Sequence, residues 1–225
     1  GDEAFFAAIN RYLTKHAYTS VEIHNLRMAF EEVTGRDLNW FFNQWFLDSG
    51  HPVFNIDHQY LDGVLTINVI QLQDLETSPL YQIPVVVDIW VNDTSQSHEL
   101  WVSEIEQEFE IPLSEVPQLV LFDSNASLLA EVSHEKSANE WAYQFQNANS
   151  FVHQVNSLQA LVNDSSATVT DQILNEALTD DFWVIRRLGV NALENRLSAN
   201  DTLRLETLAQ IAANDDKSLV RADAI

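Results

Sequence analysis

The fold is decided by two neighbouring stretches of the sequence, FEEVTGRDLNWFFNQW at residues 30–45 and GHPV at residues 50–53. Gly35 stands where a helix would end in a left-handed cap, and Asp37 can cap a further helix over residues 38–48. Gly50 can end that helix, and Pro52 bars its continuation and forces an extended exit. The two stretches therefore predict the last helix of one domain and the entry into another.

The predicted last helix carries one aromatic face, formed by Trp40, Phe41, Phe42 and Trp45. Each buried ring removes about 150–250 Å² from water, enough to dock the helix on the following domain. Two more helices precede it. The first is predicted from the helical spacing of Phe5, Ile9, Leu13 and His16. The second is predicted to begin with a capping box of Thr19 and Glu22 and to bury a stripe of Ile23, Leu26, Phe30 and Val33.

Residues 52–137 follow another pattern, in which short β-rich runs alternate with turn residues. Apolar residues alternate at Leu65, Ile67 and Val69, and Asp62-Gly63 between two runs indicates a hairpin. About seven short strands in this length predict a small antiparallel β-sandwich. The other runs are Val53–Ile56, Val85–Val91, Phe109–Ile111, Leu119–Phe122 and Leu128–Val132.

Residues 138–225 return to helical spacing and contain an internal similarity. The segment DDFWVIR at residues 180–186 aligns with DDKSLVR at residues 215–221. This pattern resembles helical repeats of the HEAT type, in which an aspartate and an arginine commonly form a ladder between neighbouring units. Such units bury their apolar faces by stacking on each other. We therefore expect a HEAT-like helical region, incomplete in this chain.

The stretches at residues 30–45 and 50–53, with Tyr12-Leu13 and His16-Ala17-Tyr18 upstream, resemble the end of the catalytic domain in the aminopeptidase-N family. The resemblance is close over residues 5–54 and loose over the whole chain. It implies a multidomain α and β fold. Residues 1–51 would be the C-terminal helices of a thermolysin-like catalytic domain, residues 52–137 a β-sandwich, and residues 138–225 part of a C-terminal superhelix.

The zinc chemistry of that family needs an HExxH helix, a further glutamate and a GxMEN-type segment, none of which this sequence contains. The pair His134-Glu135 is followed by Ala138, where a second zinc ligand would stand, and is interpreted as a boundary segment. The resemblance therefore implies zinc in the parent chain, and no catalytic, cofactor-binding or metal residue in these 225 residues. The histidines, at 16, 24, 51, 58, 98, 134 and 153, show no ligand spacing and are interpreted as surface or partly buried side chains.

Composition excludes several classes of partner. The formal net charge is −23, and residues 37–135 hold 17 acidic residues with no lysine or arginine. Such a surface repels phosphate backbones and anionic lipids, so we expect no nucleic-acid partner. No run of about 18 apolar residues occurs, so no membrane insertion is expected. Cysteine is absent, which excludes thiolate sites. Glutamates 104, 106, 108 and 110 predict a solvated strand face or, alternatively, a weak calcium site.

The function expected from the resemblance is that of a non-catalytic C-terminal fragment of a zinc-dependent aminopeptidase. The fragment would shape and close access to the active site, and would be inactive alone. Its partners would be the missing N-terminal catalytic domain and, through the parent chain, peptide substrate. Met28 as the single methionine and a chain end within a helical pattern support the expectation of a fragment. The compartment, cytoplasmic or periplasmic, stays open.

Two alternatives accompany this expectation. Arg186 and Arg221 are candidates for anchoring the carboxylate end of a peptide, because basic residues are scarce here. The competing interpretation, which we favour, places them in an aspartate–arginine ladder between repeats. The second alternative concerns the whole chain, which could belong to a zinc-less relative that serves as a protein-binding scaffold through its helical repeats.

Overall fold

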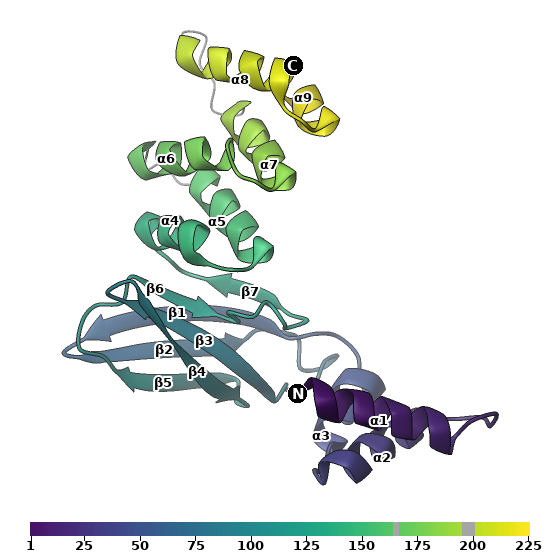
Figure 1. Cartoon of the computed structure of the whole chain (residues 1–225). Helices are drawn as coiled ribbons and strands as arrows, with labels where there is room; N and C mark the ends of the chain where they lie inside the picture. The colour runs from purple at the N-terminus through teal and green to yellow at the C-terminus, as the bar shows by residue number, and fades with distance from the viewer. Residues whose placement is uncertain (164–166, 195–200) are drawn as a thin grey trace.

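The computed structural model describes residues 1–163, 167–194 and 201–225. Figure 1 shows a central β region, with the N-terminal helices on one side of it and the later helices stacked above it. The mixture of helices and two small sheets expected from the sequence is confirmed. The assignment of these parts to three domains of a longer protein stays a prediction.

The N-terminal region contains α1 (Asp2–Lys15), α2 (Ile23–Thr34), α3 (Asn39–Phe42) and the π-helical turn η1 (Asn43–Leu47). Gly35 ends α2 with φ 66°, the left-handed cap that the sequence predicts. The Asp37 carboxylate accepts a hydrogen bond from the Asn39 backbone N–H at 2.8 Å, but the predicted cap at Asp37 is wrong by one residue, because Leu38 is the N-cap of α3.

The predicted capping box at Thr19 is wrong. Helix α2 begins three residues later than a Thr19 cap requires, and the box joins Glu22 to Asn25, whose side-chain oxygen accepts from the Glu22 N–H at 2.8 Å. The Thr19 hydroxyl instead donates to the His16 carbonyl at 2.8 Å. Both residue pairs fit a cap by spacing, and the turn after α1 decides between them.

The β region contains seven described strands in two sheets. The four-stranded sheet has the order β5-β2-β1-β7 and the three-stranded sheet the order β4-β3-β6. Their bounds are β1 (Val53–Leu61), β2 (Val64–Gln71), β3 (Ile83–Val91), β4 (Thr94–Val102), β5 (Glu106–Pro112), β6 (Leu119–Phe122) and β7 (Glu131–His134).

The two sheets share one buried core. Strand β2 alternates between partly and fully buried residues, with Leu65, Ile67 and Val69 fully buried, as its sequence pattern predicts. They pack with Val87 and Ile89 of the other sheet. The hairpin predicted at Asp62-Gly63 joins β1 to β2.

One strand pairing differs from the expected antiparallel arrangement. Strand β7 pairs with β1 in parallel, with Val53 opposite Glu131 and Ile56 opposite His134. A parallel neighbour requires a long crossover, which here consists of the five strands between them. Local sequence cannot show this pairing, because nothing near Glu131 specifies its distant partner.

The later helices are α4 (Ala138–Asn147), α5 (Phe151–Asn163), α6 (Ala167–Ala177), α7 (Trp183–Glu194), α8 (Thr202–Asn214) and α9 (Ser218–Asp223). They form two successive apolar clusters. The first is centred on Leu161, Ile173 and Ile185, and the second on Val190 and Val220. The helices therefore bury their apolar faces by stacking on their neighbours (Figure 1).

The N-terminal helices are fixed to the β region by aromatic rings and a buried amide. Trp40 meets Trp101 edge to face with ring centroids 5.2 Å apart, and Trp45 lies 5.2 Å from Tyr81. Gln44 is buried; its amide donates to the Gln82 carbonyl at 2.9 Å and accepts from the Gln82 N–H at 3.0 Å. Trp40 and Trp45 of the predicted aromatic face therefore dock on the next region, whereas Phe42 packs on Phe30 and Phe46 within the N-terminal helices.

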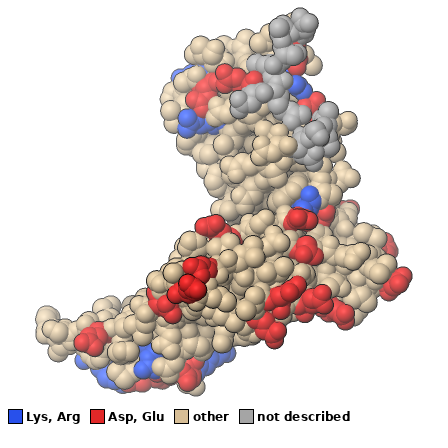
Figure 2. Space-filling view, turned by 180° about the vertical axis from the view of Figure 1, so that it is seen from behind, with Lys and Arg blue, Asp and Glu red and all other residues tan. Residues whose placement is uncertain are grey.

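Charge is distributed unevenly over the molecule. Figure 2 shows acidic side chains scattered over the β region and basic ones gathered toward the two ends. Glu106, Glu108 and Glu110 of β5 are all exposed, as the period-two pattern predicts, whereas Glu104 lies in the bend before β5 and is not part of the strand. Within the described residues, no helix is both long and apolar enough to cross a membrane.

Candidate functional site

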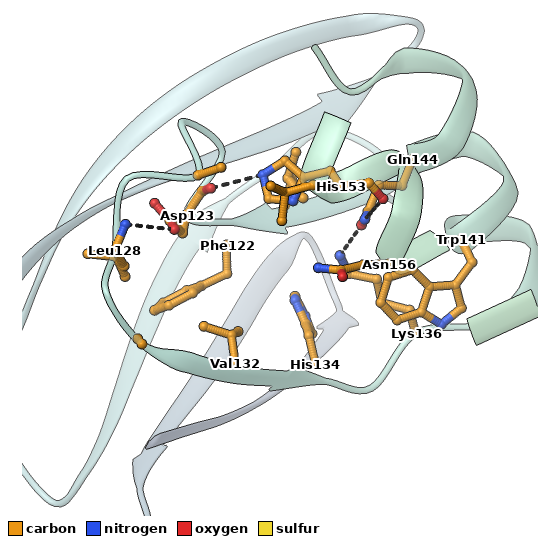
Figure 3. Close-up of a pocket in the computed structure, with 14 residues that line it drawn as sticks. Phe122, Asp123, Leu128, Val132, His134, Lys136, Trp141, Gln144, His153 and Asn156 are labelled. Carbon is orange, nitrogen blue, oxygen red and sulfur yellow. Dashed lines mark hydrogen bonds between the residues drawn. The ribbon is translucent and has the colours of Figure 1, made fainter. Parts of the chain in front are cut away.

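A candidate site lies where the β region meets the first two helices above it. A cavity of about 330 Å³ opens between β6, β7, α4 and α5 (Figure 3). Its polar lining consists of Asp123, His134, Lys136, Gln144, His153 and Asn156. Its apolar lining includes Phe122, Leu128, Val132, Trp141 and Val152. A volume of this size is typical of sites for small molecules.

Local structure explains why polar residues gather here. His134 is the last residue of β7, which is held beside β1. Ser137 caps α4 in a capping box with Glu140: the Glu140 N–H donates to the Ser137 hydroxyl at 3.3 Å and the Ser137 N–H donates to the Glu140 carboxylate at 2.9 Å. Lys136 therefore sits between the end of a paired strand and a capped helix start, with little freedom of backbone position.

Three titratable side chains form a hydrogen-bonded chain at this junction. The His58 Nε2 and a Glu140 carboxylate oxygen are 2.8 Å apart, and the His58 Nδ1 and the His134 Nε2 are 3.0 Å apart. An ionised carboxylate can only accept, so His58 donates from Nε2 and, when neutral, accepts at Nδ1 from His134. The chain joins β1, β7 and α4 through side chains alone.

The protonation preferences of this chain follow from burial and charge. Burial, followed by the charges of Lys136 and His58, holds the pKa of His134 well below its ordinary value. Burial by itself would raise the pKa of Glu140, but hydrogen bonds from His58 and Ser137 outweigh it and lower this pKa. His134 is therefore neutral and Glu140 ionised at neutral pH.

Lys136 is the unusual member of the cavity. Its ammonium donates to the Gln144 amide oxygen at 2.5 Å and lies 4.7 Å from the centre of the Trp141 ring. The residue as a whole is partly exposed, yet the protein around it is dense enough that burial lowers its pKa to about 7. The nearby Glu140 opposes this shift only in part.

The far side of the cavity is organised by Asp123. Its carboxylate accepts from the backbone N–H groups of Ser127 at 3.0 Å and Leu128 at 3.1 Å, so it is already satisfied. Its carbonyl lies 3.0 Å from the His153 Nε2 (Figure 3). His153 is buried, rather than at the surface, and burial lowers its pKa despite this hydrogen bond.

The chemistry available at this site is that of a lysine beside neutral histidines and amides, with the carboxylates of Asp123 and Glu140 already hydrogen-bonded. Over the part of the chain that the structure describes, no group of three or more His, Cys, Asp or Glu residues could hold a metal ion. The neighbouring Lys136 further opposes a cation. The cavity could instead hold a small molecule, with Lys136 as the charged contact and the apolar wall around its body.

The two arginines singled out in the sequence lie elsewhere, in the stacked helices. Arg186 of α7 makes a bidentate pair with Asp215, with nitrogen–oxygen distances of 2.8 and 2.9 Å, and also contacts Asp216. It donates to the Asp180 carbonyl at 2.9 Å. Arg221 of α9 repeats this last contact by donating to the Asp215 carbonyl at 2.6 Å.

Arg186 thus connects the two copies of the repeated segment, as an aspartate–arginine ladder would. The hydrogen bonds from Arg186 are the first cause of the low pKa of the Asp215 carboxyl, about 2. Both side chains are covered by their neighbours. The role of Arg186 and Arg221 in anchoring a substrate stays a prediction.

Comparisons with known proteins bear on the fold more than on the site. No protein-family profile matches the chain. Aminopeptidase N of Streptomyces lividans is 34% identical over 67 residues, which are 29% of this chain and 8% of that protein. The crystal structure of Legionella pneumophila aminopeptidase A in complex with aspartic acid superposes on the whole chain with a TM-score of 0.72, at 16% identity. The chain has an aminopeptidase-like fold.

The aminopeptidase-like fold seen here corresponds to part of a longer protein in both comparisons. This chain spans 32% of the length of the Legionella structure. Neither comparison assigns a role to the cavity between β6, β7, α4 and α5, the junction cavity. Its residues come from this chain's own geometry alone.

Sequence reasoning missed the junction because its residues are dispersed. His58 and His134 are separated by 76 positions and meet only through the β1–β7 pairing. Two signals were nevertheless present. Lys136 is the single basic residue between Arg36 and Arg186, and the sequence SANE at residues 137–140 is a capping box. Together they mark a lysine held at a helix start beside a histidine.

Proposed function

We propose that this chain is the C-terminal, non-catalytic part of a zinc-dependent aminopeptidase, which hydrolyses N-terminal residues from peptides. The observation that carries the proposal is the match to Aminopeptidase N, 34% identical over 67 residues. The aminopeptidase-like fold over the whole chain supports it. A peptidase-related function is the coarser statement that both comparisons favour.

Each region has a role in this proposal. Residues 1–51 are the last helices of the thermolysin-like catalytic domain, residues 52–137 a β-sandwich spacer, and residues 138–225 part of a HEAT-like superhelix. Large apolar side chains of α1, Phe5, Phe6 and Leu13, are 49%, 65% and 62% exposed. An apolar helix face of this kind is suited to packing against the remainder of a catalytic domain.

The zinc of the parent enzyme belongs to residues outside this chain in our proposal. The part of the chain that the structure describes offers no suitable ligand group, so no step of the reaction is assigned to its residues. Its contribution is to limit access: stacked helices beside a catalytic domain admit short, flexible peptides more easily than folded proteins.

Two experiments test the proposal. The first is to sequence the parent gene upstream of Gly1; an HExxH segment, a later glutamate and a GxMEN-like segment support the enzyme. Loss of those residues within an otherwise similar sequence refutes it and favours a protein-binding scaffold. The second is to assay the 225-residue chain for aminopeptidase activity with added zinc. We expect none, and zinc-dependent turnover would contradict the non-catalytic assignment.

A further inference from the structure

In the junction cavity, no carboxylate of the described ranges lies within ion-pair distance of the Lys136 side chain, although the charge of Glu140 on α4 acts to raise its pKa. Lys136 forms no ion pair among the described residues; its polar contacts are the Gln144 amide oxygen and the Trp141 ring. The nearest acid along the chain on α4, Glu140, already accepts from His58 and Ser137. Among the described basic residues, Arg36 and Arg221 also lack a carboxylate partner, but Lys136 is the one that lines this cavity.

The surroundings of Lys136 combine an apolar wall with neutral polar groups. Val132 of β7, Leu128 and Trp141 line the cavity together with the lysine (Figure 3). Asn156 of α5 also lines it and is exposed, and its side-chain amide makes no hydrogen bond within the described part of the chain. The cavity of about 330 Å³ therefore offers one cation, one free side-chain amide and a hydrophobic surface, and the Asp123 carboxylate on its far side is bound to two backbone N–H groups.

We propose that this cavity binds a small monocarboxylate with an apolar body, whose carboxylate pairs with Lys136 while its body lies against Leu128, Val132 and Trp141. A carboxylate supplies the counter-ion that Lys136 lacks, and a charge-assisted hydrogen bond in a partly enclosed site is stronger than one in water. Asn156 provides a second donor at the mouth. This inference does not depend on the activity of the parent chain.

Charge selects against other ligands. A metal cation would be repelled by Lys136 and would find no ligand group here. A dianion such as phosphate would meet the strongly acidic surface of the β region, with 17 acidic residues between positions 37 and 135. A monoanion keeps this repulsion small while it still neutralises Lys136. The apolar wall then favours acids with a hydrocarbon body.

Proton linkage gives the expected pH dependence of binding. Burial lowers the pKa of Lys136 to about 7. A bound carboxylate stabilises the ammonium, so the ligand should raise this pKa and bind more weakly as the pH rises above neutrality. The other titratable groups facing the lysine from the neighbouring elements are His134 of β7 with His58 of β1 behind it, Glu140 of α4, His153 of α5 and Asp123 after β6.

The test is a titration of the full chain with benzoate at pH 6.5, followed by the amide and indole signals of ¹⁵N-labelled protein. We expect saturable shifts at Trp141 and Val132, and none with the neutral isostere benzamide. Lys136→Met should weaken benzoate binding about tenfold or more, whereas Lys217→Met, which removes an exposed lysine of the last helices, should leave binding unchanged.

Three results would overturn the proposal. They are the absence of saturable shifts up to about 10 mM benzoate, a range that includes weak binding, equal binding of benzamide, and unchanged affinity in folded Lys136→Met. If that variant does not fold, the pKa of Lys136 is measured in the unmodified chain from its ¹⁵N-labelled side-chain amine. An upward shift with benzoate supports the site, and an unchanged pKa refutes it.

Discussion

Removal of the pair between Arg186 and Asp215 should uncouple the last helices from the rest of the stack. The guanidinium binds both carboxylate oxygens, and the exposed fractions of the two side chains are 13% and 7%. We therefore consider Arg186→Ala, Asp215→Ala and the double variant as a thermodynamic cycle, which isolates the interaction between the two side chains.

The pKa of Asp215 sets the expected magnitude of the coupling. Its fall from 3.8 to about 2 corresponds to about 2.4 kcal/mol at 1.36 kcal/mol per pKa unit. The pair is covered by its neighbours but lies near the surface, since Asp216 in the same cluster is 65% exposed. Solvent screening therefore reduces the expected coupling to about 1–2 kcal/mol.

The assay is urea unfolding of the four proteins, with hydrogen exchange of α8 and α9 as the local readout. Because the folded pKa lies below the unfolded one, the coupling is present above about pH 4 and is lost as the pH falls toward 2. The more exposed pair of Arg187 and Asp223 serves as a matched control and should show a smaller coupling. A coupling below about 0.3 kcal/mol at pH 7, within the usual error of additivity, would refute the reasoning.

The same variants separate the ladder from the substrate-anchoring prediction. In the full-length parent enzyme, a ladder role predicts that Arg186→Ala and Asp215→Ala both lower stability at an unchanged KM. An anchoring role predicts a raised KM for Arg186→Ala with intact folding, and no such rise for Asp215→Ala.

Three further predictions concern single positions. Gly50→Ala should lower the free energy of unfolding, measured in urea, by about 1–3 kcal/mol, because φ is 87° and the new methyl would lie 2.0 Å from the Ser78 Oγ. The control Gly35→Ala, with φ 66° and open space around the new methyl, should cost only about 1 kcal/mol. Equal costs for the two variants would contradict this prediction. Lys136→Met should stabilise the chain at pH 6 by about 1–3 kcal/mol, because it removes a buried ammonium. Since the folded pKa of Lys136 is about 7, the stability of the unmodified chain should rise between pH 7 and 10, and the variant should show a flatter rise. A steeper rise for the variant, measured by urea unfolding at each pH, would disprove this. His153→Gln should reduce the loss of stability on acidification below about pH 6.5, the ordinary histidine pKa, since burial lowers the folded pKa. Thermal melts at pH 5 and 7 that show the same loss for the variant and the unmodified chain would contradict it.

Sequence patterns predict most local structure in this chain because the determinants are local. The left-handed cap at Gly35, the hairpin at Asp62-Gly63 and the alternating burial of β2 each depend on a few adjacent residues. The capping box of α2 is misplaced by three residues because Thr19 and Glu22 both satisfy the same spacing. Boundaries of this kind are decided by the preceding turn.

Features that join distant segments are less accessible. The parallel pairing of β1 with β7 brings His58 beside His134, and no periodicity in either strand encodes it. The cavity around Lys136 depends on that pairing and on the docking of α4 and α5. The sequence shows that Lys136 is far from other basic residues along the chain. The apolar residues around it, and the lack of a carboxylate within ion-pair distance among the residues that the structure describes, can be seen only in the folded structure.

The pairing of β1 with β7 also sets an order of assembly during synthesis. Strand β1 emerges early, yet its free edge stays open until residues 131–134 have left the ribosome. An open edge is a site for wrong pairing with other chains, so this interval is the vulnerable one. The same strand that closes the edge leads directly, through Lys136 and Ser137, into α4. The pairing that completes the β region is therefore followed directly by the formation of α4, and each later helix packs on the part of the chain that precedes it.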